Sequence, residues 1–241
     1  FISAIEKVVT SKTKALIVLS PNNPTGAVYP EETLQRIVEM AKERDFMVIS
    51  DEVYESMLYD GRGHKSRISF PDAKDHVVQV NSFSKTYAMT GLRVGYLAAS
   101  KEKLLQFLKY HHTVNISANV PAQLACVTAM KGPQDCVEEM KEAYQKRRDL
   151  LIERLNDIPG VSCMTPKGAF YAFADIRELG IPSLELAEYL VKEAGVVLTN
   201  GSGFGREGFI RLSYATAPER IEEAMDRMKK AVIKLQSGKR K

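Results

Sequence analysis

The most informative stretch of this chain reads Ser82-Phe83-Ser84-Lys85-Thr86-Tyr87-Ala88-Met89-Thr90-Gly91-Leu92-Arg93-Val94-Gly95. An apolar run at residues 77–80 leads into it, and Lys85 stands within it among small hydroxyl side chains. A partly buried amine loses its proton more readily than an amine in water, and a neutral lysine can form a Schiff base with an aldehyde. Ser82 and Arg93 can hold an anion nearby, Arg93 through a two-pronged hydrogen bond. The alternative is an ordinary surface lysine in a loop.

Size, charge and cysteine content exclude several classes of protein. The chain has 241 residues, 44% of them hydrophobic, which is enough for a core without disulfides. Its net charge of +4 does not indicate a nucleic-acid partner but suits a small anionic ligand. The three cysteines are odd in number and lack metal-ligand spacing, which indicates a reducing compartment, here the cytoplasm. The four histidines also lack such spacing, so no metal site is expected. No apolar run approaches the roughly 18 residues of a membrane span, so no membrane partner is expected.

The first two thirds of the chain alternate strand and helix signals. Continuous apolar runs at residues 15–20 and 46–50 are typical of strands buried on both faces. Between them, Pro30 precedes two glutamates and an apolar stripe at helical spacing. Further strands are predicted at residues 77–80 and 94–99. This pattern predicts an α/β fold, a mostly parallel sheet with flanking helices.

The last third of the chain has a different pattern. A long helix is predicted to end before Pro159-Gly160, and an α+β arrangement follows it. Strands are predicted at residues 161–164, 170–173, 196–199 and 209–213, and helices at 184–194 and from a capping box at Thr216-x-x-Glu219. We therefore expect a larger domain over residues 1–150 and a smaller C-terminal α+β domain over residues 151–241.

Polar residues follow three of the predicted strands, at the strand ends where parallel sheets bind ligands. Residues 15–20 lead into the stiff turn Pro21-Asn22-Asn23-Pro24-Thr25-Gly26, which presents an amide. Residues 46–50 lead into Asp51, with Tyr54 three residues further on. Taken singly, each cluster has an ordinary explanation, since the first is a common turn, Asp51 suits a helix N-cap and Tyr54 suits a core.

Together with Lys85, these side chains form the set that pyridoxal 5'-phosphate requires. Its aldehyde needs a lysine, and its ring acts as an electron sink only when a carboxylate stands against the protonated pyridine nitrogen. Its phenolic oxygen needs donors such as an amide and a tyrosine hydroxyl. Its phosphate needs hydroxyls and a guanidinium. The combination therefore favours a cofactor site over a surface lysine.

With these motifs in view, the chain closely resembles the fold-type I, class I and II pyridoxal-phosphate-dependent aminotransferases of the aspartate/aromatic type. The resemblance covers essentially the whole chain and rests on four separated motifs. They are the stretch 82–95, the turn Asn23-Pro24-Thr25-Gly26, the step Asp51-x-x-Tyr54 and the late strand Phe209-Ile210-Arg211-Leu212-Ser213. The resemblance implies that residues 1–150 are the C-terminal part of the large cofactor-binding domain.

The resemblance also implies roles at the cofactor ring. Lys85 is expected to form the Schiff base and to move a proton between the substrate Cα and the cofactor's C4′ carbon. Asp51 is expected to pair with the pyridinium nitrogen. Asn23 and Tyr54 are expected to donate hydrogen bonds to the phenolic oxygen.

Further roles follow for the anionic groups. The resemblance implies that Ser82, Ser84 and Arg93 bind the cofactor phosphate. Arg211 is expected to bind the substrate's α-carboxylate, with Asn23 beside it, because a planar fork matches a carboxylate with two hydrogen bonds. The alternative for Arg211 is a salt bridge at a strand edge.

The implied function is transfer of the amino group of an L-amino acid to a 2-oxo acid by a homodimer. The family carries an earlier stretch with a phosphate-binding loop and a ring-stacking aromatic, and nothing before Ala15 matches it. Because the chain also begins at Phe1 in mid-pattern, we interpret it as N-terminally truncated. We expect this piece alone to bind the cofactor weakly and to turn over poorly. The donor amino acid stays open.

Three alternatives compete with this interpretation. A lyase of the same fold would use the same cofactor, because the pocket selects which Cα bond breaks. An aminotransferase-like sensor domain of a transcription regulator would use the fold without catalysis. A dinucleotide-binding enzyme would explain Gly201-x-Gly203-x-Gly205, but that spacing does not match the dinucleotide fingerprint.

Overall fold

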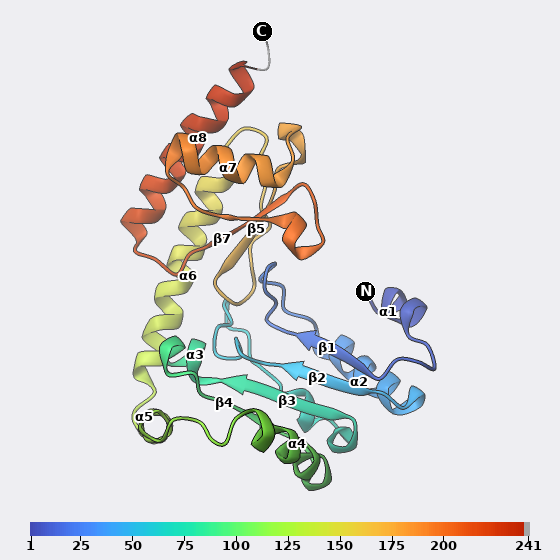
Figure 1. The fold of residues 1–241 in the computed structure, drawn as a ribbon. Helices are drawn as coiled ribbons and strands as arrows, with labels where there is room; N and C mark the ends of the chain where they lie inside the picture. Colours follow the sequence, from blue (N-terminus) through green and yellow to red (C-terminus); the bar gives the residue numbers. More distant parts are fainter. Residues whose placement is uncertain (239–241) are drawn as a thin grey trace. The chain divides into compact units, whose positions relative to one another are not determined.

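The computed structural model describes residues 1–238, and the chain divides into two compact units (Figure 1). The first unit consists of Phe1–Pro21 and Val28–Glu138. The second consists of Asn22–Ala27 and the chain from Glu139 onward. The division after Glu138 falls inside the long helix α6, and the domain boundary expected at residue 150 lies further along that helix.

The first unit is built on a four-stranded sheet (Figure 1). Its strands follow the order β1 (Ala15–Leu19), β2 (Met47–Asp51), β3 (Val77–Ser82) and β4 (Gly95–Ala98). The β1–β2 and β2–β3 pairs are parallel, and β4 pairs with β3 in the antiparallel direction. The prediction of an α/β fold with a mostly parallel sheet is therefore confirmed.

Helices α1 (Ile2–Val8) and α2 (Glu31–Arg44) share a core with the sheet. The predicted stripe of α2 is buried, including Ile37 at 1% exposure, because its apolar side chains recur on one helical face. The core residues of this cluster are Ile5, Val9, Val18, Leu34, Ile37, Val38, Met40, Ala41, Phe46, Val48, Phe70, Ala73 and Val77. This packing fixes one face of β1 to β3.

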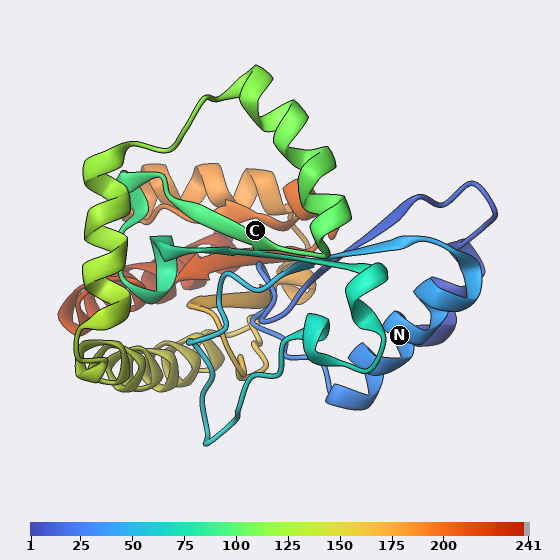
Figure 2. The same cartoon turned by 90° about the horizontal axis from the view of Figure 1, so that it is seen from below.

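Two further helices complete the first unit, α4 (Lys101–Val114) and α5 (Val120–Lys131). Figure 2 shows α4 on the opposite side of the sheet from α2. The sequence patterns above do not predict α4, and none of its described side chains is buried. Leu104, Phe107 and Leu108 recur at helical spacing on one face of α4, but this face is not buried.

The second unit contains a three-stranded antiparallel sheet. Its strand order is β5 (Tyr171–Asp175), β7 (Phe209–Ser213) and β6 (Thr199–Asn200). Helices α6 (Asp135–Asn156), α7 (Ser183–Ala194) and α8 (Pro218–Gly238) accompany it. No helix within residues 1–238 is both long and apolar enough to cross a membrane.

Two of the strands expected in the second unit differ from the prediction. Residues 161–164 form no strand, because only Ser162 bridges to the sheet, through Asp175. The strand expected at residues 196–199 is reduced to Thr199–Asn200, since Val196 donates its backbone N–H to Leu190 at the end of α7 instead. Apolar runs of four residues are too short to decide between a strand and an irregular segment.

Candidate active site

Two neighbouring strands of the first unit end at the same edge of the sheet. Asp51 is the last residue of β2 and pairs with Val80 of β3. Strand β3 ends at Ser82 and continues directly into α3 (Phe83–Thr86), which carries Lys85. Because β2 and β3 are parallel, their carboxyl ends place Asp51 and α3 at one edge of the sheet.

Lys85 lies in a short helix and not in the loop that the sequence suggested. Ser82 caps this helix, because its Oγ accepts a hydrogen bond of 3.1 Å from the Ser84 N–H. The Ser82 hydroxyl lies 2.9 Å from the Ser84 hydroxyl and 3.1 Å from the Val94 carbonyl oxygen. Ser84 is buried and Lys85 is half-buried. The hydroxyl residues therefore hold the helix that presents the lysine.

Arg93 follows on the adjoining segment and is exposed. Its backbone is left-handed, with φ of 56°, and its Nη1 donates to the Thr90 carbonyl at 2.9 Å. Two residues later, Gly95 pairs with Ser82 across the strands. A Cβ on Gly95 would lie 2.7 Å from the Asn81 carbonyl oxygen, so only glycine allows this close approach.

The turn after β2 links the Asp51 segment to α3. Asp51 Oδ1 accepts a hydrogen bond of 3.1 Å from the Val53 N–H, which orients the carboxylate. Tyr54 is buried, with 4% of its surface exposed. Thr86 donates to the Ser56 hydroxyl at 3.3 Å, which connects α3 to the same turn.

In the second unit, Arg211 on β7 is held by two hydrogen bonds. Its Nη1 donates to Asn23 Oδ1 at 2.9 Å, and its Nη2 donates to Thr199 Oγ1 at 3.2 Å. The guanidinium carbon lies 4.6 Å from the ring centre of Tyr171 and 4.9 Å from that of Phe204. Two aromatic rings and two hydrogen bonds therefore restrict the guanidinium.

Asn23 belongs to a turn that closes on itself and packs within the second unit. The Asn22 N–H donates to the Ala27 carbonyl at 2.8 Å, and the Gly26 carbonyl accepts from the N–H groups of Lys167 and Gly168. Gly26 has φ of +65°, and a Cβ there would lie 2.4 Å from the Pro166 Cβ. The Asn-Pro-Thr-Gly motif thus needs glycine for two independent reasons.

The structure divides the predicted site residues between the two units. The first unit brings together Asp51, Tyr54, Ser82, Ser84, Lys85 and Arg93 on β2, β3, α3 and the turns beside them. The second unit brings together Asn23 and Arg211. The roles of all eight residues stay predictions.

A buried carboxylate next to Asp51 was missed by the sequence analysis. Glu52 is completely buried, and its Oε1 accepts hydrogen bonds from the Ser50 hydroxyl at 2.6 Å and the Ser66 hydroxyl at 3.1 Å. Its Oε2 lies 2.7 Å from His64 Nε2 and accepts from Gln79 Nε2 at 3.1 Å. We call this group the Glu52 network, and its members are Ser50, Glu52, His64, Ser66, Arg67 and Gln79.

Arg67 completes the Glu52 network as a buried counter-ion. Its Nη1 lies 3.2 Å from Glu52 Oε1, and its backbone N–H donates to the same oxygen at 3.1 Å. Burial raises the pKa of Glu52, but hydrogen bonds from His64 and Ser50 and the charge of Arg67 outweigh it and lower this pKa to about 2. Burial lowers the pKa of Arg67, and the Glu52 charge opposes that shift. Glu52 is therefore ionised at neutral pH, with the Arg67 guanidinium beside it.

The same region contains three side chains of metal-ligating type, since ligand atoms of Glu52, Glu55 and His64 lie within 4.8 Å of one another. Donors already occupy both oxygens of Glu52, and the Arg67 guanidinium stands against one of them. A cation beside a fixed guanidinium would be repelled. We therefore describe the group as a hydrogen-bonded ion pair. The adjacent acids Asp51 and Glu52 at a strand end are the sequence signal that could have revealed it.

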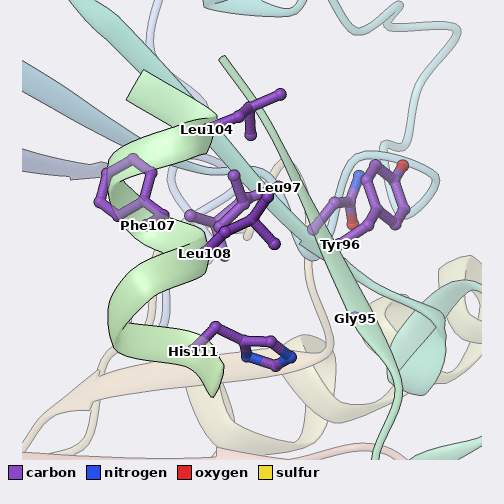
Figure 3. A pocket seen from close by; sticks show the side chains of 9 residues that line it. Gly95, Tyr96, Leu97, Leu104, Phe107, Leu108 and His111 are labelled. Atoms are coloured by element: carbon purple, nitrogen blue, oxygen red, sulfur yellow. The ribbon is translucent and has the colours of Figure 1, made fainter. Parts of the chain in front are cut away.

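An apolar hollow of about 430 Å³ lies between β4 and α4 in the first unit (Figure 3). Figure 3 shows Leu97 of β4 pointing toward Leu104 and Leu108 of α4. None of the eight predicted site residues lines it. The hollow is therefore separate from the candidate active site.

Comparison with known proteins identifies relatives of this chain. The family described as "Aminotransferase class I and II" matches residues 2–228. Aromatic-amino-acid aminotransferase 2 of Thermococcus litoralis and an aspartate aminotransferase of Pyrococcus abyssi are each 44% identical over 238 residues. In both cases the match covers 96% of this chain and 60% of the relative. The chain thus spans 60% of the length of these curated relatives.

Solved structures agree with the fold. The crystal structure of an aromatic aminotransferase from Pyrococcus horikoshii superposes with a TM-score of 0.94 at 42% identity, covering 97% of this chain and 64% of that one. A double mutant of the Thermus thermophilus aspartate aminotransferase gives a TM-score of 0.89 at 38% identity, covering 95% of this chain and 59% of that one.

Proposed function

Because this chain belongs to the class I and II aminotransferases, whose members use pyridoxal 5'-phosphate, we propose that the protein moves the amino group of an L-amino acid to a 2-oxo acid. The observation that carries the proposal is the placement of Asp51 and Lys85 at one edge of the sheet, on the neighbouring elements β2 and α3. The chain spans 60% of its curated relatives, so this activity is proposed for the protein as a whole.

The donor set of the first unit fits the cofactor. An amine, a carboxylate, two hydroxyls and a guanidinium correspond to the aldehyde, the pyridine nitrogen and the phosphate of pyridoxal phosphate. Lys85 would hold the aldehyde, and Asp51 would hold the pyridine nitrogen. The phosphate would be held by Ser82, Ser84 and Arg93. When bound, the cofactor supplies an aldehyde carbon that reacts with amines and a ring that accepts electrons.

Lys85 would act twice in the reaction. Its amine would hold the cofactor in the resting protein, and it would then take the proton from the Cα atom of the amino acid. Its half-buried position on a capped helix limits the places that the amine can reach. Asp51 would keep the ring nitrogen protonated through its carboxylate.

Arg211 and Asn23 would bind the substrate carboxylate and orient Cα. An arginine has donors only, so the amide oxygen of Asn23 must face Arg211 at the observed 2.9 Å. The Nδ2 group of Asn23 would then be available as a donor to the phenolic oxygen of the cofactor. Tyr54 would be the second donor to that oxygen.

The alternatives from the sequence are less favoured. The relatives named above are aminotransferases for aromatic amino acids and for aspartate, and they share the same identity of 44% with this chain. We therefore favour amino transfer over lyase chemistry and over a regulatory sensor. Because the chain is equally identical to an aromatic and to an aspartate aminotransferase, an experiment has to decide which amino acid is the donor.

The function is tested by cofactor binding followed by transfer. The 241-residue chain is mixed with pyridoxal phosphate, treated with borohydride and digested, and we expect the cofactor on the peptide that contains Lys85. The Lys85→Ala variant should show no such peptide, and borohydride labelling of a different residue would contradict the assignment. A panel of amino acids with 2-oxoglutarate as acceptor, applied to the full-length protein, then identifies the donor.

We also propose a homodimer and a cytoplasmic location. Exposed apolar side chains crowd α4 and α5, and large exposed apolar surfaces mark interaction sites. They include Leu105, Tyr110, Val114, Val120, Leu124 and Met130. The three cysteines are free, which suits a reducing compartment. Sedimentation velocity should give twice the chain mass, and a monomer across the concentration range would refute the dimer.

A further inference from the structure

Asp51 and Glu52 are adjacent but occupy opposite sides of the strand end. Side chains alternate along an extended strand, so Ser50 and Glu52 share one side and Asp51 faces the other. The burial agrees, because Ser50 and Glu52 are fully buried and Asp51 is half-buried. Whatever holds Glu52 in place therefore also sets the direction of the Asp51 carboxylate.

The Glu52 network connects three neighbouring strands, β1, β2 and β3. Glu52 bonds to Ser50 on β2 and to Gln79 on β3. Through its ion pair with Arg67 it also reaches the end of β1, because Arg67 Nη2 donates to the Ser20 carbonyl at 3.2 Å. One carboxylate thus links the three strands that lead to the predicted cofactor residues.

Stability alone does not account for such a network. A buried ion pair is often no more stabilising than apolar side chains of the same volume, because desolvation offsets the attraction. Hydrogen bonds define the position of each carboxylate oxygen, because they depend on direction. An apolar cluster does not orient side chains in this way. His64 is partly exposed, at 18% of its side chain, and contacts Glu52 Oε2 at 2.7 Å, with Glu55 Oε2 3.9 Å away.

We infer that Glu52 and His64 are positioning residues, which fix the end of β2 so that the Asp51 carboxylate meets the ring nitrogen of the cofactor. This inference rests on the proposed function for its consequence. That the Glu52 network fixes the end of β2 does not depend on the cofactor, and hydrogen exchange measures it without the cofactor.

The test uses matched variants of the full chain. His64→Leu removes the contact to Glu52, whereas His64→Gln keeps an N–H donor of similar reach. Glu52→Gln removes the charge. Glu207→Gln is the control, because Glu207 accepts hydrogen bonds from Ser183 but belongs to the other unit. The readouts are thermal unfolding, hydrogen exchange of residues 50–55, and the dissociation constant of pyridoxal phosphate from absorbance titration.

We expect faster exchange at residues 50–55 in His64→Leu and Glu52→Gln, with roughly tenfold weaker cofactor binding, or about 1.4 kcal/mol. His64→Gln should stay close to the wild-type protein in both readouts. Glu207→Gln should lower the unfolding temperature without either effect. If Glu52→Gln does not fold, His64→Leu carries the test, since His64 is only half-buried and its contacts are with Glu52 and, at 3.9 Å, with Glu55.

Two results would overturn the inference. One is unchanged exchange and binding in His64→Leu, and the other is equal weakening by Glu207→Gln at the same loss of stability. A full-length wild-type protein that binds no cofactor would refute the proposed function instead. In that case the exchange at residues 50–55 still decides whether the Glu52 network fixes the strand end.

Discussion

Arg211 donates a hydrogen bond of 2.9 Å to Asn23, although 188 residues separate them in the chain. The bond joins a residue of the final strand to a turn near the start of the sequence, inside one compact unit. It leaves Arg211 oriented by an amide oxygen and flanked by two aromatic rings. This arrangement suits a carboxylate that arrives from outside, because the amide neutralises none of the guanidinium charge.

Replacing Arg211 with lysine should lower kcat/KM for the amino acid by roughly a hundredfold. Lysine keeps the charge but loses the fork, and a charge-assisted hydrogen bond contributes about 1.5–3 kcal/mol. The control is Arg206→Lys, since Arg206 is an exposed arginine that stacks on Phe209. Steady-state kinetics with several donors measures the effect. Equal losses in the two variants would argue against a carboxylate clamp.

Replacing Gly26 with alanine should destabilise the protein more than replacing Gly61. Both glycines have positive φ, so each substitution costs about 1 kcal/mol of backbone strain. Only Gly26 adds a clash, with Pro166 Cβ 2.4 Å from the new atom, whereas nothing lies within 4 Å of Gly61. We expect a further loss of about 2 kcal/mol for Gly26→Ala in urea unfolding. Equal midpoints for the two variants would show that the turn is not tightly packed.

The Glu52→Gln variant should be less stable than the wild-type protein at neutral pH, and this difference should disappear in acid. The folded pKa of Glu52 is about 2 against an ordinary value of 4.5, so its carboxylate stabilises the protein above about pH 4.5. That contribution, on the order of 3 kcal/mol, declines as the pH falls from about 4.5 toward 2. Urea unfolding at several pH values should therefore show the wild-type and variant curves converging in acid. Parallel curves would mean that Glu52 is not ionised in the folded state.

Thiol reagents should modify Cys136 well before Cys163 in the native protein. Cys136 is exposed, whereas Cys163 is buried, and burial raises the pKa of the Cys163 thiol to about 11. Because the thiolate is the reactive form, this shift from 9 reduces its population roughly a hundredfold. Mass spectrometry of iodoacetamide-treated peptides gives the two rates. The difference should vanish in urea, and equal native rates would contradict the burial of Cys163.

The sheet and the main helices could be predicted because their signals are local. The apolar runs before Asp51 and the stripe of α2 each lie within one element. Helix α3 could not be predicted, since four residues carry no helical period and Ser82 looks like any loop serine. The site residues followed from motifs, but the Glu52 network needed His64 and Arg67, whose positions depend on how a long turn folds back.

The membership of Asn22–Ala27 in the second unit affects the order in which the chain can fold as it is synthesised. The ribosome releases this turn before its backbone partners Lys167 and Gly168 and before its side-chain partner Arg211. Until then the turn has only its internal hydrogen bonds, such as Asn22 to Ala27. Co-translational folding can therefore complete the parallel sheet of the first unit before the second unit forms. The Asn23–Arg211 bond can then form only after the final strand β7 has emerged.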